Sequence, residues 1–211
     1  MSNKPPPLQF GCYYHLYNRG INRENIFFEE RNYNHFLKLY GHHFASLVDT
    51  YAYCLLKNHF HFSARVKSKE EIIQTPGVLD TPGVSEDSIT PEWVSHKFGN
   101  VLNAYAKAIN KAYDRTGSLF QQRFGRVQVT SNSHLLYLVR YIHRNPQKHG
   151  FVKDFRDWPY SSFHALASNG VTRLDRNEVL SWFGDKEDFQ RAHMNETETQ
   201  PIAYLIADDF D

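Results

Sequence analysis

The sequence predicts an α+β fold in which a largely antiparallel sheet has helices packed on one face. Segments with alternating apolar and polar residues indicate strands, and segments with apolar residues three or four apart indicate helices. Their order along the chain is strand, helix, strand, strand, helix, strand, helix. Because this order is typical of a sheet covered by helices on one side, we expect the other sheet face to stay open.

The strands are predicted from short, aromatic-rich alternating segments. They span residues 11–18, 51–56, 59–66 and 126–130. The second and third strands are separated only by Lys57 and Asn58. A two-residue connection of this kind is typical of an antiparallel hairpin.

The helices are predicted from the spacing of their apolar residues. They span residues 31–46, 93–115 and 134–145. We expect the last of them to stop before Pro146, because proline disfavours the helical conformation in the residue before it. A short helix is also predicted within the segment "RLDRNEVLSWFG", residues 173–184.

Two stretches depart from this pattern. The segment "TPGVLDTPGVSEDSITPE" holds prolines, glycines and acids but few large apolar residues, which predicts a mobile surface insertion near residues 68–90. Residues 167–211, with the acidic end "ADDFD", are predicted to be a C-terminal appendage. The core domain is therefore assigned to residues 1–166.

Composition limits the class of protein. The 211 residues are 41% hydrophobic and 22% charged, which is typical of a globular protein with room for one domain. The sequence has no apolar run of about 18 residues and no secretion-signal pattern, so we expect a cytoplasmic protein with no membrane partner. Cys12 and Cys54 lack paired spacing and are expected to be buried thiols. Since the net charge is only +1, any cations that bind nucleic acid must be gathered locally.

The segment "LLKNHFHFSARV" places two histidines on one side of a strand. Successive strand residues alternate between faces, so His59 and His61 share a side with Ser63 and Arg65, opposite Phe60 and its apolar neighbours. Histidine-triad hydrolases need a histidine where Ser63 stands, and two-histidine phosphoesterases need a second histidine strand. A metal site, a binding surface and ordinary hydrogen-bonded histidines remain open.

The helix over residues 134–145 carries two further candidates. With about 100° of turn per residue, Tyr141 and Asn145 lie together on a flank of its apolar face. On their own, a tyrosine at such a flank is an ordinary packing residue and an asparagine before proline ends a helix.

Taken in order, the segments "YYHLYNRGINRENIF", "LKNHFHF", "LFQQRF", "YLVRYIHRNPQKHGFV" and "DWPYSSF" form a series. This series resembles the single-tyrosine HUH transposases, and in particular the REP-associated tyrosine transposases, over about residues 11–166. The resemblance implies a ferredoxin/RRM-like HUH core. It also implies Tyr141 as the nucleophile and His59, His61 and Asn145 as ligands of Mg²⁺ or Mn²⁺, with no ATP. The third ligand is glutamine in many relatives, and Tyr137 is a rival nucleophile that does not fall on the family position.

The activity implied is a metal-dependent single-stranded DNA endonuclease and strand transferase. It would act on hairpin-bearing DNA through a 5′-phosphotyrosine intermediate, as a monomer or a homodimer. A non-catalytic single-stranded nucleic-acid-binding protein remains an alternative, because aromatic alternation on an open sheet face also describes RNA-recognition modules. A relaxase or replication initiator of the HUH class is another.

Residues expected to bind DNA are cations for the phosphates and aromatic rings for unpaired bases. The cations are Arg19, Arg23, Arg65, Lys107, Lys111, Arg115, Arg123 and Arg126, and the rings are Tyr13, His15 and Tyr17.

Overall fold

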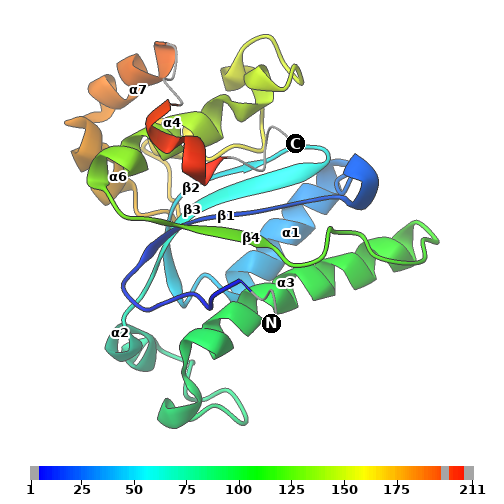
Figure 1. Cartoon of the computed structure of the whole chain (residues 1–211). Coiled ribbons are helices and arrows are strands. Elements are labelled where there is room, and N and C mark those ends of the chain that lie inside the picture. Colours follow the sequence, from blue (N-terminus) through cyan, green and yellow to red (C-terminus); the bar gives the residue numbers. More distant parts are fainter. Residues whose placement is uncertain (1–4, 196–199, 207–211) are drawn as a thin grey trace.

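Four strands form one sheet in the computed structural model, which describes residues 5–195 and 200–206 (Figure 1). The strands are β1 (Tyr13–Arg19), β2 (Val48–Leu55), β3 (His59–Val66) and β4 (Gly125–Val129), in the order β2-β3-β1-β4. Every neighbouring pair is antiparallel. The predicted α+β fold with an antiparallel sheet is therefore confirmed.

The connection between β2 and β3 is the predicted tight hairpin. The backbone N–H of Leu56 donates to the carbonyl of His59 at 2.8 Å, which encloses Lys57 and Asn58 as a two-residue loop. The turn makes His59 the first residue of β3, opposite Arg19 at the end of β1. The hairpin and the end of β1 thus meet where the first histidine stands.

Helices α1 (Glu30–His43) and α3 (Pro91–Ala112) cover the phenylalanine side of the sheet (Figure 1). The ring centroid of Phe60 lies 5.1 Å from that of Phe36 on α1 and 6.2 Å from that of Phe98 on α3. Phe62 is fully buried on the same side. The apolar residues of β3 therefore form the core and turn the histidines to the opposite face, as the alternation predicted.

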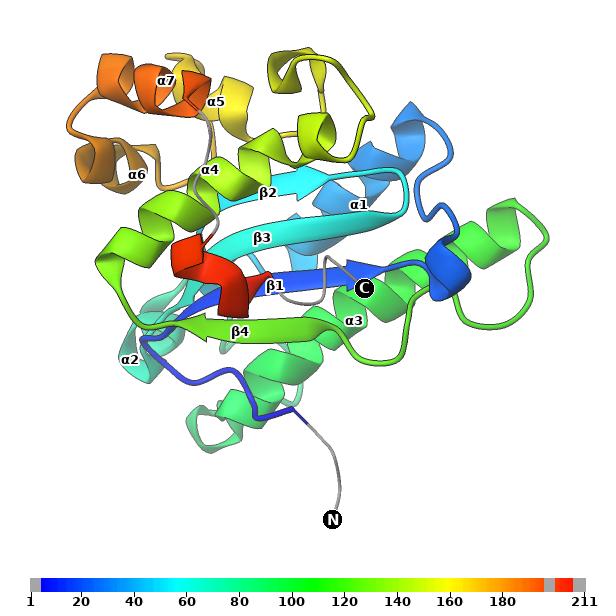
Figure 2. The ribbon, with the colours of Figure 1, turned by 45° about the horizontal axis from the view of Figure 1, so that its top comes forward.

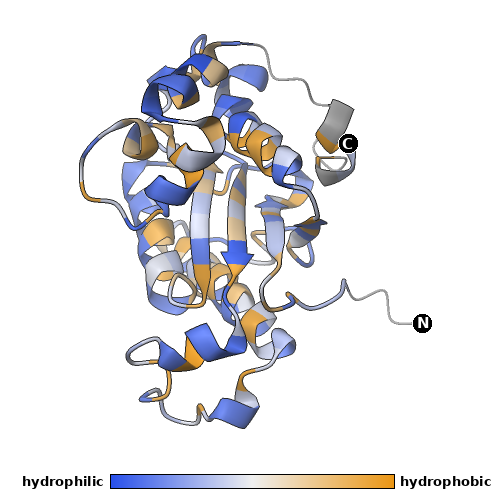
Figure 3. Ribbon diagram, turned by 90° about the vertical axis from the view of Figure 1, so that its left-hand side faces the viewer, coloured by the Kyte–Doolittle hydropathy of each residue, from blue (hydrophilic) through white to orange (hydrophobic). Residues whose placement is uncertain are grey.

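The opposite face is not open, and that expectation was wrong. Helix α4 (Asn132–Lys148) packs across it against β2 and β3 (Figure 2). The apolar side of α4, including Leu138 and Ile142, is fully buried, and beneath the helix His15 and His61 are each only 1% exposed. This face was expected to be solvated because its strands carry polar residues. It is covered instead because α4 is amphipathic and buries its apolar side against the sheet. Figure 3 shows hydrophobic and hydrophilic residues interspersed along the strands. This agrees with one sheet face being apolar and the other carrying polar residues.

Helix α4 also continues through Pro146 to Lys148, although we expected it to stop before the proline. The N–H of His149 donates to the carbonyl of Asn145, and the N–H of Phe151 donates to the carbonyl of Pro146. The proline therefore lies in the last turn, where it removes one donor while the following residues still supply bonds to the final carbonyls.

The insertion contains a short helix α2 (Lys69–Gln74) and a single 3₁₀ turn η2 (Glu86–Ser88). Ser68 and Glu71 form a capping box at the start of α2, and Val78 and Ile89 are buried. The segment lies at the foot of the molecule, beside the start of α3 (Figure 1). Its predicted mobility stays a prediction.

The chain after α4, which includes the predicted tail, consists of short helices that pack against α4 and β2. They are α5 (Phe163–Ala167), α6 (Arg176–Phe183) and α7 (Lys186–Met194), preceded by the 3₁₀ turn η3 (Phe155–Asp157) and followed by η4 (Gln200–Leu205). The helix expected within residues 173–184 is confirmed as α6. The Tyr51 hydroxyl of β2 donates to Glu178 of α6 at 3.0 Å. The acidic end "ADDFD" lies outside the described residues, and the domain boundary at 166 stays a prediction.

Two expectations from composition can be compared with the structure. Cys54 is buried and Cys12 is half-buried, and both are free thiols. Within the described ranges, the helices are all too short or too polar to cross a membrane.

A buried histidine pair fastens the tail to α4. His143 Nδ1 lies 2.8 Å from Nε2 of His193 on α7, and the Nδ1–H of His193 donates to the carbonyl of Phe189 at 2.7 Å. This sets one direction for the chain, in which His143 donates to His193 and accepts from the Ser162 hydroxyl at 2.7 Å. Both histidines are fully buried, so the pair is stable in its neutral form.

We therefore expect the fold to lose stability in mild acid partly through His193. Burial, opposed by the bond to Phe189 and aided by the positive charges of Arg140 and Arg144, lowers its pKa from 6.5 to about 3. Between these values the unfolded chain binds a proton that the folded chain excludes. The free energy of unfolding should thus fall by about 1.4 kcal/mol per pH unit on this account as the pH drops below the ordinary histidine value.

Urea unfolding of the wild type and of His193→Gln between neutral pH and mild acid measures this contribution. The glutamine amide keeps a donor and an acceptor but does not titrate, so the variant should show a flatter loss of stability with acid. Equal slopes for the two proteins would contradict the assignment.

Candidate active site

The two histidines of β3 lie side by side beneath α4. Their ring centroids are 5.1 Å apart, and His59 is 3% and His61 1% exposed. Strand alternation places both on the side opposite Phe60, and pairing with β1 adds Arg19 and Tyr17 to the same face. The structure thus brings together the histidines that the sequence predicted, in a buried setting.

The Nδ1 atom of each histidine forms a hydrogen bond with a neighbouring side chain. His59 Nδ1 lies 2.7 Å from Oδ1 of Asn58, and His61 Nδ1 lies 2.9 Å from Nε2 of His15. An amide oxygen only accepts, so His59 must donate from Nδ1 and carry its lone pair on Nε2. The same tautomer of His61, donating to His15, also leaves an Nε2 lone pair for a ligand.

Asn145 adds an amide beside His59. It is fully buried, and both side-chain atoms of Asn145, like His59 Nε2, lack a hydrogen-bond partner within residues 5–195 and 200–206. Buried polar atoms without partners are costly and call for a ligand. Within the same ranges, histidine, cysteine and acidic residues form no group of three that could hold a metal, so a third donor of another type, such as this amide, would be needed.

These groups fit a divalent ion. Two imidazole nitrogens and an amide oxygen are donors that Mn²⁺ and Mg²⁺ accept, and the set contributes no negative charge. Burial lowers the pKa of His59 to about 3, with smaller effects from the charges of His149 and Arg19, while Asn145 acts in the opposite direction. Burial also lowers the pKa of His61 well below its ordinary value. Both rings are therefore neutral at physiological pH, the form that binds metal.

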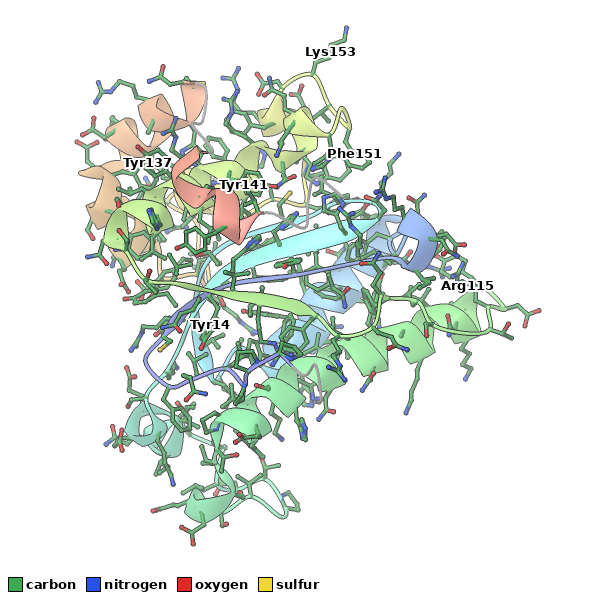
Figure 4. All side chains as sticks on the ribbon, in the orientation of Figure 1. Tyr14, Arg115, Tyr137, Tyr141, Phe151 and Lys153 are labelled. Carbon is green, nitrogen blue, oxygen red and sulfur yellow. The ribbon has the colours of Figure 1, made fainter. Side chains whose placement is uncertain are left out.

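Tyr141 projects from α4 toward the same place. Its ring centroid is 6.0 Å from that of His61 and 6.5 Å from that of His15, edge-on to both. The Lys148 ammonium lies 4.6 Å from the tyrosine ring centroid, and Tyr141 is only 2% exposed. Figure 4 shows Tyr141 on the side of α4 that faces the sheet, one turn after Tyr137, which is half-buried.

A cleft of about 570 Å³ opens beside the histidines. We call it the histidine cleft. It is lined by Pro5, Tyr17, Asn18, Arg19, Arg23, His59, His61, Gln121, Gln122, Arg123, Phe124, Gly125 and Arg126. Four of the arginines predicted to bind DNA therefore surround one opening next to the histidine pair. This concentrates positive charge that the overall net charge of +1 did not reveal.

The Tyr17 ring lies across the backbone of β4 at the wall of this cleft. A Cβ atom added to Gly125 would fall 2.1 Å from the ring, so only glycine permits this approach. Tyr17 is half-buried and lines the histidine cleft. Of the three aromatic residues predicted on β1, it is the one that reaches the cleft.

The other predicted DNA contacts lie elsewhere or are engaged. Arg65 forms ion pairs with Asp49 at 2.6 Å and Glu71 at 2.8 Å, and Arg115 pairs with Glu24 at 3.0 Å. Lys107 and Lys111 are exposed on α3, across the sheet from the histidines, and Figure 4 places Arg115 near the far end of that helix. Tyr13 contacts Tyr51 and Glu178, while His15 is buried against His61. All eleven DNA-binding assignments made from the sequence, eight cations and three aromatic rings, stay predictions.

Three residues near the site were missed from the sequence. Asn58 could have been found from its place directly before His59, and Lys148 from its helical spacing of seven after Tyr141. His149 follows the end of α4 with its ring centroid 4.9 Å from that of His59, which no periodic pattern indicates.

Comparisons with known proteins show which proteins the chain is similar to. A REP-associated tyrosine transposase of Escherichia coli is 36% identical over 72 residues, which is 34% of this chain and 40% of that protein. A Haemophilus influenzae protein, named provisionally for the same family, is 27% identical over 118 residues, or 55% of this chain and 59% of the relative. The matches thus span about half the length of these relatives. No family model matches the sequence.

A solved structure described as a REP-associated tyrosine transposase bound to a REP hairpin has the same fold. It superposes with a TM-score of 0.56 at 19% identity, over 82% of this chain and 88% of that one. The chain is similar to REP-associated tyrosine transposases. The resemblance expected from the sequence is therefore confirmed. The transposase fold extends over more of the chain than the sequence matches do.

Proposed function

We propose that this protein is a transposase-type enzyme that cleaves and rejoins single-stranded DNA next to a hairpin. The observation that carries the proposal is the 6.0 Å separation of the Tyr141 and His61 rings within one chain. A tyrosine and a pair of neutral imidazoles are thus close enough to act on one phosphate without a second subunit. The names of the relatives and the hairpin bound by the related structure support the substrate class.

In this proposal His59, His61 and Asn145 hold a divalent ion, Mg²⁺ or Mn²⁺. When bound, such an ion neutralises charge on a scissile phosphate and favours attack by an oxygen nucleophile. Asn58 and His15 keep the two imidazoles in the tautomer that presents Nε2. Arg19, Arg23, Arg123 and Arg126 hold neighbouring phosphates of the strand in the histidine cleft.

Tyr141 supplies the nucleophile. Tyrosine phenols in general have a pKa of about 10, so the proton of a tyrosine nucleophile must leave as attack proceeds. The oxygen of Tyr141 bonds to phosphorus, the bond from phosphorus to the 3′ oxygen breaks, and the proton passes to solvent while the leaving 3′ oxygen takes one up. The Lys148 ammonium, 4.6 Å from the Tyr141 ring centroid, makes a cation–π contact that helps to hold the ring in place. Because the phosphotyrosine ester keeps the energy of the phosphodiester, rejoining needs no ATP.

The proposal is tested by labelling hairpin DNA separately on each side of the cleavage point. With Mn²⁺ or Mg²⁺, the fragment carrying the 5′ phosphate should migrate with the denatured protein, and the other fragment should carry a 3′ hydroxyl that a polymerase can extend. Cleavage that leaves both fragments free of protein would contradict a tyrosine nucleophile.

Non-catalytic binding of single-stranded nucleic acid is the second candidate. The burial of Tyr141, at 2% exposure, favours it, because a nucleophile must reach its phosphate. On this alternative the labelled hairpin would bind in the histidine cleft, and neither fragment would form under any divalent ion.

His15 provides a further test of the metal proposal. Replacing it by phenylalanine removes the acceptor for His61 Nδ1–H, whereas His15→Gln retains an amide oxygen that accepts. We expect His15→Phe to weaken Mn²⁺ binding about tenfold to a hundredfold and His15→Gln to weaken it less. Mn²⁺ titration followed by electron paramagnetic resonance measures both, and unchanged affinity in His15→Phe would show that this hydrogen bond does not position the ligand.

A further inference from the structure

A second groove adjoins the histidine cleft along helix α3. It has a volume of about 650 Å³, and we call it the α3 groove. It is lined by Pro5, Pro6, Pro7, Glu92, Ser95, His96, Gly99, Asn100, Asn103, Arg123, Phe124 and Arg126. Pro5, Arg123, Phe124 and Arg126 line both openings, so the two share one wall.

Arg126 stands in that shared wall with a half-buried guanidinium. Its guanidinium carbon lies 3.6 Å from the Phe124 ring centroid, and within the described ranges its buried Nε atom has no hydrogen-bond partner and no carboxylate forms an ion pair with it. Burial lowers its pKa to about 10, an effect that Tyr14 opposes and the charge of Arg123 reinforces. A cation removed from water without an anion is costly, and a phosphate would complete its environment.

Arg123 lies beside it in an unusual backbone conformation. Its φ is 64°, in the left-handed region that residues other than glycine rarely adopt. Arg123 is exposed and lines both the histidine cleft and the α3 groove. The wall between the histidine cleft and the α3 groove thus carries two adjacent cations.

The α3 side of the groove is polar and continuous. His96, Asn100 and Asn103 follow one another at helical spacing, and the same row continues through Lys107 and Lys111 toward the end of the helix. Asparagine amides both donate and accept, as unpaired base edges require. Glu92, at the first turn of α3, is the carboxylate among the described lining residues, so the positive charge lies toward the histidine cleft.

We propose that single-stranded DNA flanking the cleavage point passes from the histidine cleft into the α3 groove, with its phosphates at Arg123 and Arg126. Its bases then lie beside Asn100 and Asn103, and its distal phosphates follow the row toward Lys107 and Lys111. The inference rests on the proposed function for the identity of the strand. It assigns to α3 a flank-binding role that is separate from the chemistry at Tyr141.

Gly99 gives a clean way to test the groove. A Cβ atom at Gly99 would meet nothing within 4 Å, so substitutions there enter the groove without displacing the protein. Gly99→Ala is the matched control, because it keeps the groove open and favours the helix. Gly99→Glu places a negative side chain in the groove, and Gly99→Lys places a positive one of similar length there.

The measurement is the affinity of each protein for hairpin DNA with a flank of about four or about twelve nucleotides, lengthened on each side in turn. Lengthening at least one flank should tighten binding of the wild type and of Gly99→Ala about tenfold, since one additional hydrogen bond between an arginine and a phosphate contributes about that much. Gly99→Glu should lose this gain, and Gly99→Lys should keep it. An equal gain in Gly99→Glu and Gly99→Ala, or no gain in the wild type, would overturn the inference.

The short-flank hairpin separates this inference from the proposed function. In this proposal the short flank ends within the histidine cleft, so Gly99→Glu should form covalent adduct on it as readily as the wild type. If covalent adduct forms but the longer flank tightens binding equally in the wild type and in Gly99→Glu, the groove proposal is rejected and the catalytic proposal is kept. A flank effect that Gly99→Glu abolishes, without adduct in any protein, would retain the groove and reject the catalytic proposal.

Discussion

Tyr141→Phe should form no covalent adduct with hairpin-bearing single-stranded DNA, a loss of at least about a thousandfold if the phenol is the nucleophile. The substitution removes one oxygen and keeps the ring. The edge-on contacts with His61 and His15 and the Lys148 contact can therefore persist, and the fold and the affinity for DNA should change little.

Tyr137→Phe is the matched control for this variant. It makes the same chemical change one turn earlier on α4, at a half-buried position, and should leave adduct formation intact. Both variants are assayed on the labelled hairpin with Mn²⁺, followed by denaturing gel electrophoresis. Adduct in Tyr141→Phe, or its loss in Tyr137→Phe, would move the nucleophile away from Tyr141.

Replacing both histidines, as His59→Ala with His61→Ala, should abolish Mn²⁺ binding and divalent-dependent cleavage. The loss in cleavage should be on the order of a thousandfold or more, because metal-assisted charge neutralisation contributes several kcal/mol to such reactions. The core on the other side of β3 is made by Phe60 and Phe62, which the variant retains, so we expect it to fold.

The control for this double variant is His42→Ala, an exposed histidine on α1. Circular dichroism reports folding, Mn²⁺ titration reports the site, and binding of an uncleaved hairpin reports the arginines of the histidine cleft. Normal Mn²⁺ affinity in the double variant would place the metal elsewhere. Loss of folding would instead assign the pair a structural role.

The sequence predicted the strands well because alternation along a strand is a local property. His59 to Val66 was placed at its observed bounds, and the two-residue turn fixed the direction of its neighbour. The position of α4 could not be read in this way. The face that it covers carries His15, Tyr17 and His61, whose polar atoms resemble those of a solvated surface, while their hydrogen bonds form only between strands distant in the sequence.

The candidate site shows the same division. Tyr141, Asn145 and the histidines were named from family resemblance, yet their burial and their orienting partners depend on contacts across elements. Arg65 was predicted to bind DNA from its place on the expected open face of the sheet. Its two ion-pair partners are not apparent from the sequence alone. Asp49 stands opposite it only in the register of β2 with β3, and Glu71 belongs to the insertion.

Because the tail packs against α4, inactivating mutations should also occur in the part of the gene that encodes the tail. Helix α4 carries Tyr141 and Asn145, and it is held from outside by α7, where Arg144 donates to the carbonyl of His193 at 2.7 Å. Substitutions that loosen α7, such as at Phe189, would shift the helix that bears the proposed nucleophile without touching DNA. We expect a screen for inactive alleles to recover changes in this distant segment alongside those in the cleft.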